Sequence, residues 1–307
     1  MVIGARGTVA SAAIAVVVGL GALAAPAALA APPAVPAVAG SPVVTGWAPA
    51  GRAGLHPGVV TETAGGGSCT ANFVFTAGER VFLGQAAHCA GTGDVTETDG
   101  CSSSTGPVGT EVTIHGSDGR DRTGTMAYSS WVTMQADHET DRDACANNDF
   151  ALVELSPDDA TDVNPSMPFF GGPKSLREGT LRDGAPVLGY GNSTTRAGVA
   201  ALSPKAGSIV STTSGGFGQE VSMANPGIPG DSGSGFLTGN GEAVGVLSTL
   251  NLAPLPVSNG MTNLAEALRY AADHGFADVE LEPGTEPFTP KPAALLPVAR
   301  GPGIGQE

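Results

Sequence analysis

Glycine and proline are the residues that most restrict what this chain can fold into. The 307 residues include 46 glycines and 24 prolines. Glycine permits tight turns with positive φ, whereas proline removes a backbone donor and interrupts helices. Long helices are therefore disfavoured over most of the chain, and the sequence predicts many short strands joined by tight turns.

The two ends of the chain differ in composition from the part between them. Residues 1–30 combine an arginine, an apolar run and small residues near position 30, which is typical of a secretory signal peptide. A transmembrane anchor is the alternative, but the run is short and rich in alanine and glycine. Residues 31–56 carry almost no charge and resemble a linker or short pro-segment. Closely spaced prolines predict that residues 277–307 form a disordered tail.

Between these ends, short runs rich in β-branched and aromatic residues alternate with turn residues, as in an all-β fold. The proline- and glycine-rich stretch 157–173 is the predicted linker between an N-terminal β unit, residues 57–156, and a C-terminal unit, residues 174–276. The predicted strands are 69–76, 81–88, 111–114, 125–132, 150–155, 186–190, 208–212, 219–223, 235–237 and 243–248.

Two local signals complete this outline. Residues 239–241 read Gly-Asn-Gly, a strong hairpin turn signal, because these residues accept positive φ. Residues 262–274 form the one convincing helix, since their apolar side chains recur at i, i+3, i+4 and i+7 before Gly275.

Charge and cysteine content narrow the class of function. The formal net charge is −15, so phosphate backbones would be repelled and nucleic acid is not an expected partner. The four cysteines are even in number, and together with an export signal they predict two disulfides. Zinc is the alternative, but the chain has neither a C-x-x-C motif nor paired histidine spacing. The cysteines are Cys69, Cys89, Cys101 and Cys145.

The motif GDSGSG at residues 230–235 is the sharpest chemical signal in the sequence. A serine hydroxyl needs a neighbouring base to become a nucleophile, and backbone N–H donors to stabilise the oxyanion that forms. Glycines around Ser232 let the chain turn tightly enough to aim several N–H groups at one point. Taken alone, the motif could equally be a simple turn between strands.

Two further segments supply the other groups that such chemistry requires. AAHC at residues 86–89 ends an apolar strand with His88 beside a cysteine, and NNDFALVEL at residues 147–155 places Asp149 at the start of another strand. Each has a plain alternative: His88 could be a packed structural histidine and Asp149 a turn residue. Their order along the chain, His, Asp, Ser, differs from that of subtilisin and of the α/β-hydrolases.

Together, AAHC, NNDFALVEL and GDSGSG resemble the motifs of chymotrypsin-like serine endopeptidases, in particular their secreted bacterial branch. The resemblance covers about residues 57–276. It implies an all-β fold of two six-stranded antiparallel β-barrels packed perpendicular to each other, with a C-terminal helix. It also implies that Ser232 is the nucleophile, His88 the general base and Asp149 the residue that orients His88.

The same resemblance assigns further roles. The N–H groups of Gly230 and Ser232 would form the oxyanion hole. Cys69 would pair with Cys89 beside the histidine, and Cys101 with Cys145.

The residue before the nucleophile pairs with a new N-terminus in animal members, and the usual N-terminal motif is missing here. Asp231 is therefore expected to pair with an internal base, for which Arg196 and Arg182 are the candidates. Pro226 stands six residues before Ser232, where an aspartate would select basic substrates. Ser248 and Leu250 match the strand that lines the substrate pocket, so we expect cleavage after small or medium apolar residues.

Several alternatives remain at this point. A catalytically silent relative could bind a partner through the same cleft, while an α/β-hydrolase would need a histidine after the nucleophile, where only His274 stands. The acidic stretch 137–143 has calcium-like spacing but lacks the expected glycine, which favours a solvated loop. We expect a secreted, extracellular monomer that acts on proteins or peptides, with no metal or other cofactor and no stable membrane association.

Overall fold

The computed structural model describes residues 46–94, 96–196, 199–251 and 258–291. The predicted signal peptide and most of the predicted linker, residues 1–45, lie outside the described residues, as does the end of the predicted tail. Among the residues described, no helix has the length and apolar character that crossing a membrane requires.

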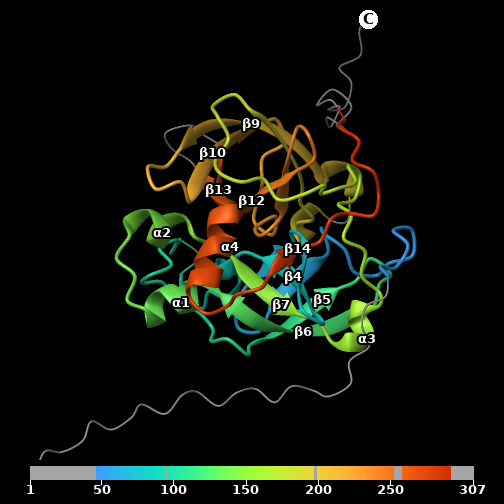
Figure 1. The fold of residues 1–307 in the computed structure, drawn as a ribbon, viewed down its shortest axis with the longest axis horizontal. Helices are drawn as coiled ribbons and strands as arrows, with labels where there is room; N and C mark the ends of the chain where they lie inside the picture. Colours follow the sequence, from blue (N-terminus) through green and yellow to red (C-terminus); the bar gives the residue numbers. More distant parts are fainter. Residues whose placement is uncertain (1–45, 95, 197–198, 252–257, 292–307) are drawn as a thin grey trace, which may run out of the picture. The chain divides into compact units, whose positions relative to one another are not determined.

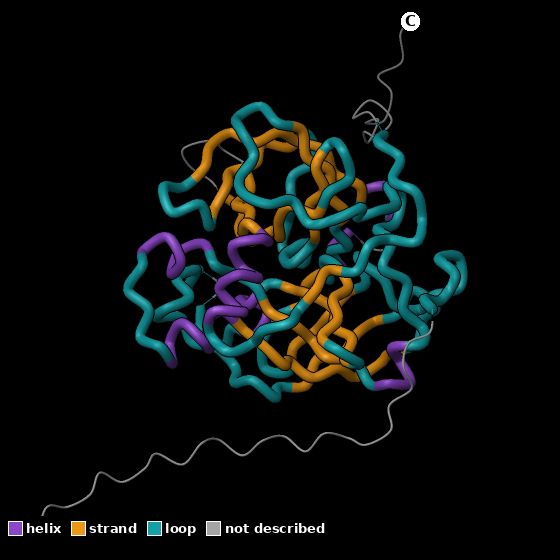
Figure 2. The backbone as a smooth tube through the Cα atoms, in the orientation of Figure 1, coloured by secondary structure: helices purple, strands orange, loops and turns teal. Residues whose placement is uncertain are grey.

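The described chain is built mainly of short antiparallel strands connected by loops (Figure 2). The first sheet contains β1 (Val60–Thr63), β2 (Ser68–Thr70), β3 (Val74–Ala77), β4 (Arg80–Gln85), β5 (Glu111–His115), β6 (Asp121–Ser129), β7 (Ala151–Glu154) and β14 (Glu280–Leu281). The second contains β8 (Pro186–Tyr190), β9 (Pro204–Thr212), β10 (Gly218–Met223), β11 (Gly235–Thr238), β12 (Ala243–Asn251) and β13 (Ser258–Asn263).

The two sheets differ in whether they close. The second is a closed barrel in the order β10-β13-β12-β11-β8-β9, whereas the first is open in the order β14-β3-β4-β7-β6-β5-β1-β2. The prediction of an all-β fold with two β units is therefore confirmed, and the second unit is the six-stranded barrel expected. The expectation of a second closed barrel is corrected: the first unit is a curled, eight-stranded sheet.

The first sheet fails to close because residues 71–73 interrupt the chain between β2 and β3. The N–H of Ala71 donates to the Val59 carbonyl at 2.9 Å, and the N–H of Asn72 to the Gly84 carbonyl at 2.8 Å. These two bonds tie one short segment to the residue before β1 and to β4, which lie towards opposite ends of the strand order, so the sheet curls towards closure without a continuous ladder. Thr70, the last residue of β2, lies next to this interruption.

One buried apolar cluster takes side chains from both sheets and from the C-terminal helix. Phe73, Phe75 and Phe150 come from the first unit, Val246 from the barrel, and Leu264 from the helix α4 (Leu264–Asp273). Each of these side chains is completely buried. Figure 1 shows α4 in red-orange beside the barrel strand β12 and the short helix α1 (Ser130–Ala136). The two units therefore share a core.

The helices are more numerous than the sequence predicted. Besides α1 and α4, the described chain contains α2 (Arg142–Asn147), α3 (Pro157–Ala160) and the 3-10 turns η1 (Ala87–Ala90), η2 (Thr194–Arg196) and η3 (Ala200–Leu202). The strand predicted at 125–132 ends at Ser129, because the chain turns into α1 and buries Trp131 and Met134 there. The helix predicted from residue 262 begins at Leu264, since Thr262 belongs to β13 and Asn263 caps the helix.

The prediction of a disordered tail from residue 277 is wrong for residues 277–291. β14 pairs with β3 at the edge of the first sheet, and the N–H of Thr289 donates to the Phe170 carbonyl at 2.7 Å. The six residues before Pro283 contain no proline, so a ladder can form. Among the described residues, Pro283, Pro287 and Pro290 follow in a segment without strand pairing, where they remove no ladder bond.

The predicted linker also ends earlier than expected. Leu55 is fully buried and its N–H donates to the Asp162 carbonyl, while the N–H of Ala48 donates to the Val163 carbonyl at 2.9 Å. Residues 46–56 thus belong to the folded body. The buried side chains of Ala53 and Leu55 anchor the segment, although its composition resembles a linker.

Candidate active site

His88 is held in the 3-10 turn that follows β4. Cys89, the next residue, is joined to Cys69 of β2, so the turn is tied both to β4, which it follows, and to β2. The side chain of His88 is 27% exposed. The imidazole is thus fixed at its base and remains open to solvent at its edge.

Asp149 lies between α2 and β7 with its side chain buried. One carboxylate oxygen, Oδ1, accepts the backbone N–H of His88 at 2.9 Å, and the other, Oδ2, lies 2.6 Å from His88 Nδ1. Burial alone would raise the pKa of Asp149, but the charge of His88 and its hydrogen bonds hold the pKa below the usual 3.8. Asp149 is therefore a buried anion facing the inner nitrogen of the imidazole.

Ser232 lies in the loop between β10 and β11, and this loop docks on the first sheet. The N–H of Thr70 donates to the Ser232 carbonyl at 2.8 Å, and the Asn72 side-chain amide to the Gly233 carbonyl at 3.0 Å. Gly233 has φ +86°, and a Cβ on it would lie 2.9 Å from Ala86 N, so glycine is needed at this position. The structure thus brings the loop of Ser232 against the strand end that leads to His88.

Ser248 has a role that the sequence did not indicate. It was assigned to the substrate pocket, yet its Oγ donates to Asp149 Oδ2 at 2.6 Å. A second residue that the sequence missed is Trp131, whose ring centroid lies 6.3 Å from that of His88. Both contacts join segments far apart in the sequence, so no local motif marks them.

Asp231 is completely buried and pairs with two cations. Its Oδ2 lies 2.6 Å from Arg196 Nη2 and 2.9 Å from Lys205 Nζ, and the side chain of Lys205 is also fully buried. The pKa of Asp231 is lowered: burial acts to raise it, but Arg196 and Lys205 outweigh that effect. Of the two expected partners, Arg196 makes the contact, whereas Arg182 is exposed and has no ion pair among the described residues.

The proposed pocket residues surround a tightly supported loop. The carbonyl of Pro226 accepts a weak bond from Arg196 Nη2 at 3.4 Å, and the N–H of Gly227 donates to Asn259 Oδ1 at 2.8 Å. Leu250 is 40% exposed at the end of β12. Asn259, which the sequence analysis did not select, therefore fixes the backbone beside Pro226.

The acidic stretch 137–143 is ordered by bonds to the backbone and to neighbouring side chains. The Asp141 side chain caps α2 by accepting two backbone N–H groups, and Glu139 accepts two more. Asp143 Oδ2 accepts the hydroxyl of Thr213 and the N–H of Phe217. These acceptors therefore already have donors within the chain.

Two groups of potential metal ligands occur among the described residues, and each contains both halves of a disulfide. One group is Cys69, His88 and Cys89; the other is Asp99, Cys101 and Cys145. The structure joins Cys69 to Cys89 and Cys101 to Cys145, the pairing that the family resemblance implied. Their sulfur atoms are therefore not available as thiolate ligands.

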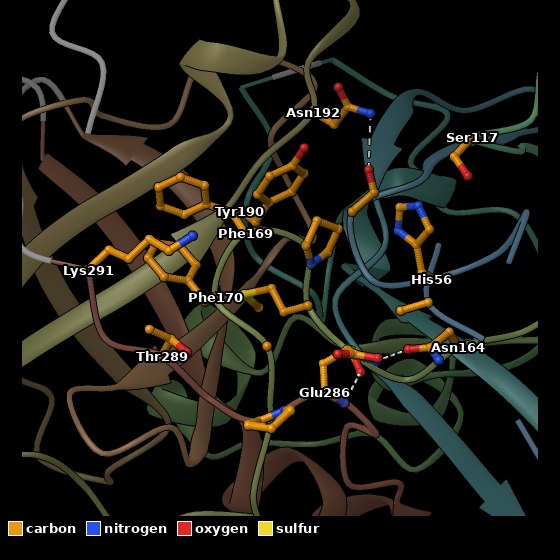
Figure 3. A pocket seen from close by; sticks show the side chains of 17 residues that line it. His56, Ser117, Asn164, Phe169, Phe170, Tyr190, Asn192, Glu286, Thr289 and Lys291 are labelled. Atoms are coloured by element: carbon orange, nitrogen blue, oxygen red, sulfur yellow. Dashed lines mark hydrogen bonds between the residues drawn. The ribbon is translucent and has the colours of Figure 1, made fainter. Parts of the chain in front are cut away.

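A cavity of about 750 Å³ lies on another part of the described chain, and its lining includes none of the three proposed catalytic residues. Figure 3 shows Tyr190, Phe169 and Lys291 around it, with Lys291 Nζ 3.8 Å from the centroid of the Phe169 ring. Asn192 on its edge donates to the Gly58 carbonyl, and the next residue, Ser193, donates its N–H to Asp231. Two adjacent residues thus connect these features: Asn192 lines the cavity, and Ser193 donates a hydrogen bond to Asp231.

We predict that Asp231→Asn destabilises the protein by about 3–5 kcal/mol, because it leaves two buried cations without their anion. The free energy of unfolding in urea measures this change. Lys205→Met should cost less, since Asp231 keeps Arg196. Asp183→Asn, on an exposed carboxylate, is the matched control and should leave stability unchanged; an equal loss in the control would contradict the prediction.

No family model and no curated protein matches this chain. Among solved structures it is similar to Thermobifida fusca protease A, with 19% identity over 75% of this chain and 99% of the other and a TM-score of 0.47. It is also similar to a Nocardiopsis protease, with 18% identity over 74% and 98% and a TM-score of 0.43. For a Cellulomonas bogoriensis chymotrypsin the corresponding values are 18%, 74%, 98% and 0.44. The described chain thus combines a closed six-stranded barrel with a curled, eight-stranded sheet.

Proposed function

We propose that this chain is a serine endopeptidase in which Ser232, His88 and Asp149 form the catalytic triad. The observation that carries the proposal is the 2.6 Å contact between His88 Nδ1 and Asp149 Oδ2. The carboxylate side chain is 5% exposed and the imidazole 27%, so substrate can reach the histidine but not the aspartate. A buried carboxylate behind a reachable imidazole is the arrangement that general-base activation of a serine requires.

In the proposed reaction, Ser232 Oγ attacks the carbonyl carbon of the scissile peptide. With its ring proton on Nδ1 facing Asp149, His88 accepts the hydroxyl proton at Nε2 and then donates it to the leaving amine. This breaks the C–N bond and leaves an ester on Ser232. A water molecule, deprotonated by the same Nε2, then hydrolyses the ester and restores the hydroxyl.

The N–H groups of Gly230 and Ser232 are proposed to bind the oxyanion. Neither N–H donates a hydrogen bond within the described part of the chain, whereas those of Asp231, Gly233 and Ser234 all do. Gly230 has φ +94°, a conformation that favours glycine. One lost donor in such a site typically costs about 2.7–4 kcal/mol of transition-state stabilisation.

Cleavage after small or medium apolar residues fits the side chains around Pro226. A Cβ on Gly227 would collide with the buried Leu247, and the amide of Asn259 is already occupied by backbone bonds. Asp231 is saturated by its own cations, so it offers no free charge to a basic substrate. Burying an unpaired arginine or lysine here would be costly.

We also propose that the protein is exported. Two disulfides, Cys69–Cys89 and Cys101–Cys145, are built into the fold, and such bonds persist in oxidising compartments. The apolar start of the chain agrees with this proposal. Protein or peptide substrates met outside the cell would then be the natural targets.

Replacing the nucleophile tests the proposed function. Ser232→Ala should abolish peptide hydrolysis while leaving the unfolding free energy within about 0.5 kcal/mol of the parent. A fluorophosphonate probe, followed by peptide mass spectrometry, should label Ser232 in the parent and nothing in the variant. Turnover by Ser232→Ala within about tenfold of the parent would contradict the triad assignment. A folded parent that neither turns over substrate nor takes up the probe would instead favour a silent binding protein.

The pH dependence of kcat/KM should follow the protonation of His88. Burial lowers the pKa of His88, but the charge and hydrogen bond of Asp149 outweigh it and raise the pKa above the usual 6.5. Only neutral imidazole accepts a proton, so kcat/KM should fall about tenfold per pH unit below that pKa. Asp149→Asn should move this acid limb to lower pH and reduce kcat about 10⁴-fold. A limb that stays in place would contradict the assignment.

The specificity of cleavage can be measured on matched peptides that differ only in the residue before the scissile bond. We expect kcat/KM to be highest with Ala, Val or Leu and lowest with Arg and Glu. Graded differences of about 1–3 kcal/mol are typical where only methylene groups change. Leu250→Gly should relax discrimination against Phe. If Arg or Phe ranks first in the parent, Pro226 and Leu250 do not form the pocket.

A further inference from the structure

Thr262 makes an unusual pair of contacts with the backbone around Asp149. Its Oγ1 donates to the Asn147 carbonyl at 2.7 Å and accepts the N–H of Asp149 at 3.3 Å. The residue is only 1% exposed. One hydroxyl thus bridges the two peptide groups that lead into the proposed catalytic carboxylate.

Thr262 is held in β13, a strand of the closed barrel. β13 pairs with β10 on one side and with β12 on the other, and Thr262 lies opposite Gly218 and Val246. Two residues beyond Val246, Ser248 of β12 donates to the Asp149 carboxylate. Two adjacent strands of the barrel therefore bind Asp149: β13 contacts the backbone of Asp149, and β12 contacts its carboxylate.

A second hydroxyl performs the same task from the opposite side. Ser130 Oγ donates to the Asn148 carbonyl at 2.7 Å and accepts the N–H of Phe150 at 3.1 Å. Ser130 opens α1, a helix that follows a strand of the first sheet. The peptide group between Asn148 and Asp149 is thus held by both hydroxyls, its carbonyl by Ser130 and its N–H by Thr262.

We propose that Thr262 is a positioning residue for Asp149, through which the barrel fixes the orientation of the carboxylate towards His88. This inference rests on the proposed peptidase function. The hydroxyl acts on the backbone of Asp149 and touches neither substrate nor the reacting atoms. Without it, the Asp149 N–H loses its partner, so the backbone of Asp149 is held less tightly and the bond to His88 lengthens. A displacement of about 1 Å of a catalytic group can cost on the order of 10²-fold in rate.

The test compares Thr262→Val, which keeps the shape of the side chain and removes the hydroxyl, with Thr262→Ser, which keeps the hydroxyl. We expect kcat to fall roughly 10- to 100-fold in Thr262→Val with KM nearly unchanged. Thr262→Ser should stay within about threefold of the parent. The acid limb of kcat/KM should also shift to lower pH in Thr262→Val, because the anion is held less closely to His88.

Thr238→Val is the matched control for loss of a buried hydroxyl in the same barrel. Thr238 Oγ1 accepts the N–H groups of Asn240 and Glu242 in the hairpin turn and has no contact with the triad. This variant should lower the unfolding free energy without changing kcat or the pH profile. An equal fall of kcat in both valine variants would overturn the proposal, as would parental kcat in a folded Thr262→Val.

A separate measurement distinguishes this inference from the proposed function. The pKa of His88 can be followed by NMR on histidine-labelled Ser232→Ala, which needs no turnover. Adding Thr262→Val should lower that pKa, whereas adding Thr238→Val should not. If the parent enzyme proves inactive, the proposed function fails while this comparison still decides whether Thr262 positions Asp149. An unchanged His88 pKa in the Thr262→Val background would overturn the proposal alone.

Discussion

The arrangement of this molecule depends on the hydrogen bonds made by the buried carboxylate of Asp149. An anion that is almost wholly removed from water is costly unless charge-assisted hydrogen bonds replace its hydration. Here the donors come from both β units: His88 lies in the turn that follows β4 of the first sheet, and Ser248 lies in the barrel. The two units therefore cannot separate without leaving this carboxylate short of donors, so folding and the geometry of the site are linked.

Much of the barrel could be predicted from the sequence, and the three residues of the proposed triad could be selected from it, because their signals are local. Strands β8 to β12 lie where short runs of β-forming residues predicted them, and the Gly-Asn-Gly turn joins β11 to β12. GDSGSG marks Ser232 through its own glycines. The bond from Ser248 to Asp149, by contrast, links residues 99 positions apart. Nothing near Ser248 in the sequence indicates which of its neighbours it meets.

Strand β13 was missed because it does not resemble a strand in sequence. It reads SNGMTN, yet Asn259, Thr262 and Asn263 are each at most 1% exposed. Their polar atoms are used in the core: Asn259 binds Gly227, Thr262 binds the backbone of Asp149, and Asn263 caps α4. A pattern based on apolar alternation cannot detect a strand whose buried side chains are chosen for hydrogen bonds. The predicted helix start at residue 262 is two residues too early, because Thr262 belongs to β13 and Asn263 caps α4.

Where the first sheet stays open, its backbone binds a loop of the barrel, just as the polar strand β13 binds the backbone of Asp149. Unpaired backbone groups at a sheet opening need partners when they are buried, and the N–H of Thr70 finds one in the carbonyl of Ser232. The loop that carries Ser232, which belongs to the barrel, is thus held by the first sheet. Asp149, which lies just before β7 of the first sheet, is hydrogen-bonded to Thr262 and Ser248 of the barrel. Because each unit holds a residue of the other, a fully closed first barrel would pair the N–H of Thr70 within its own ladder and remove the anchor of Ser232.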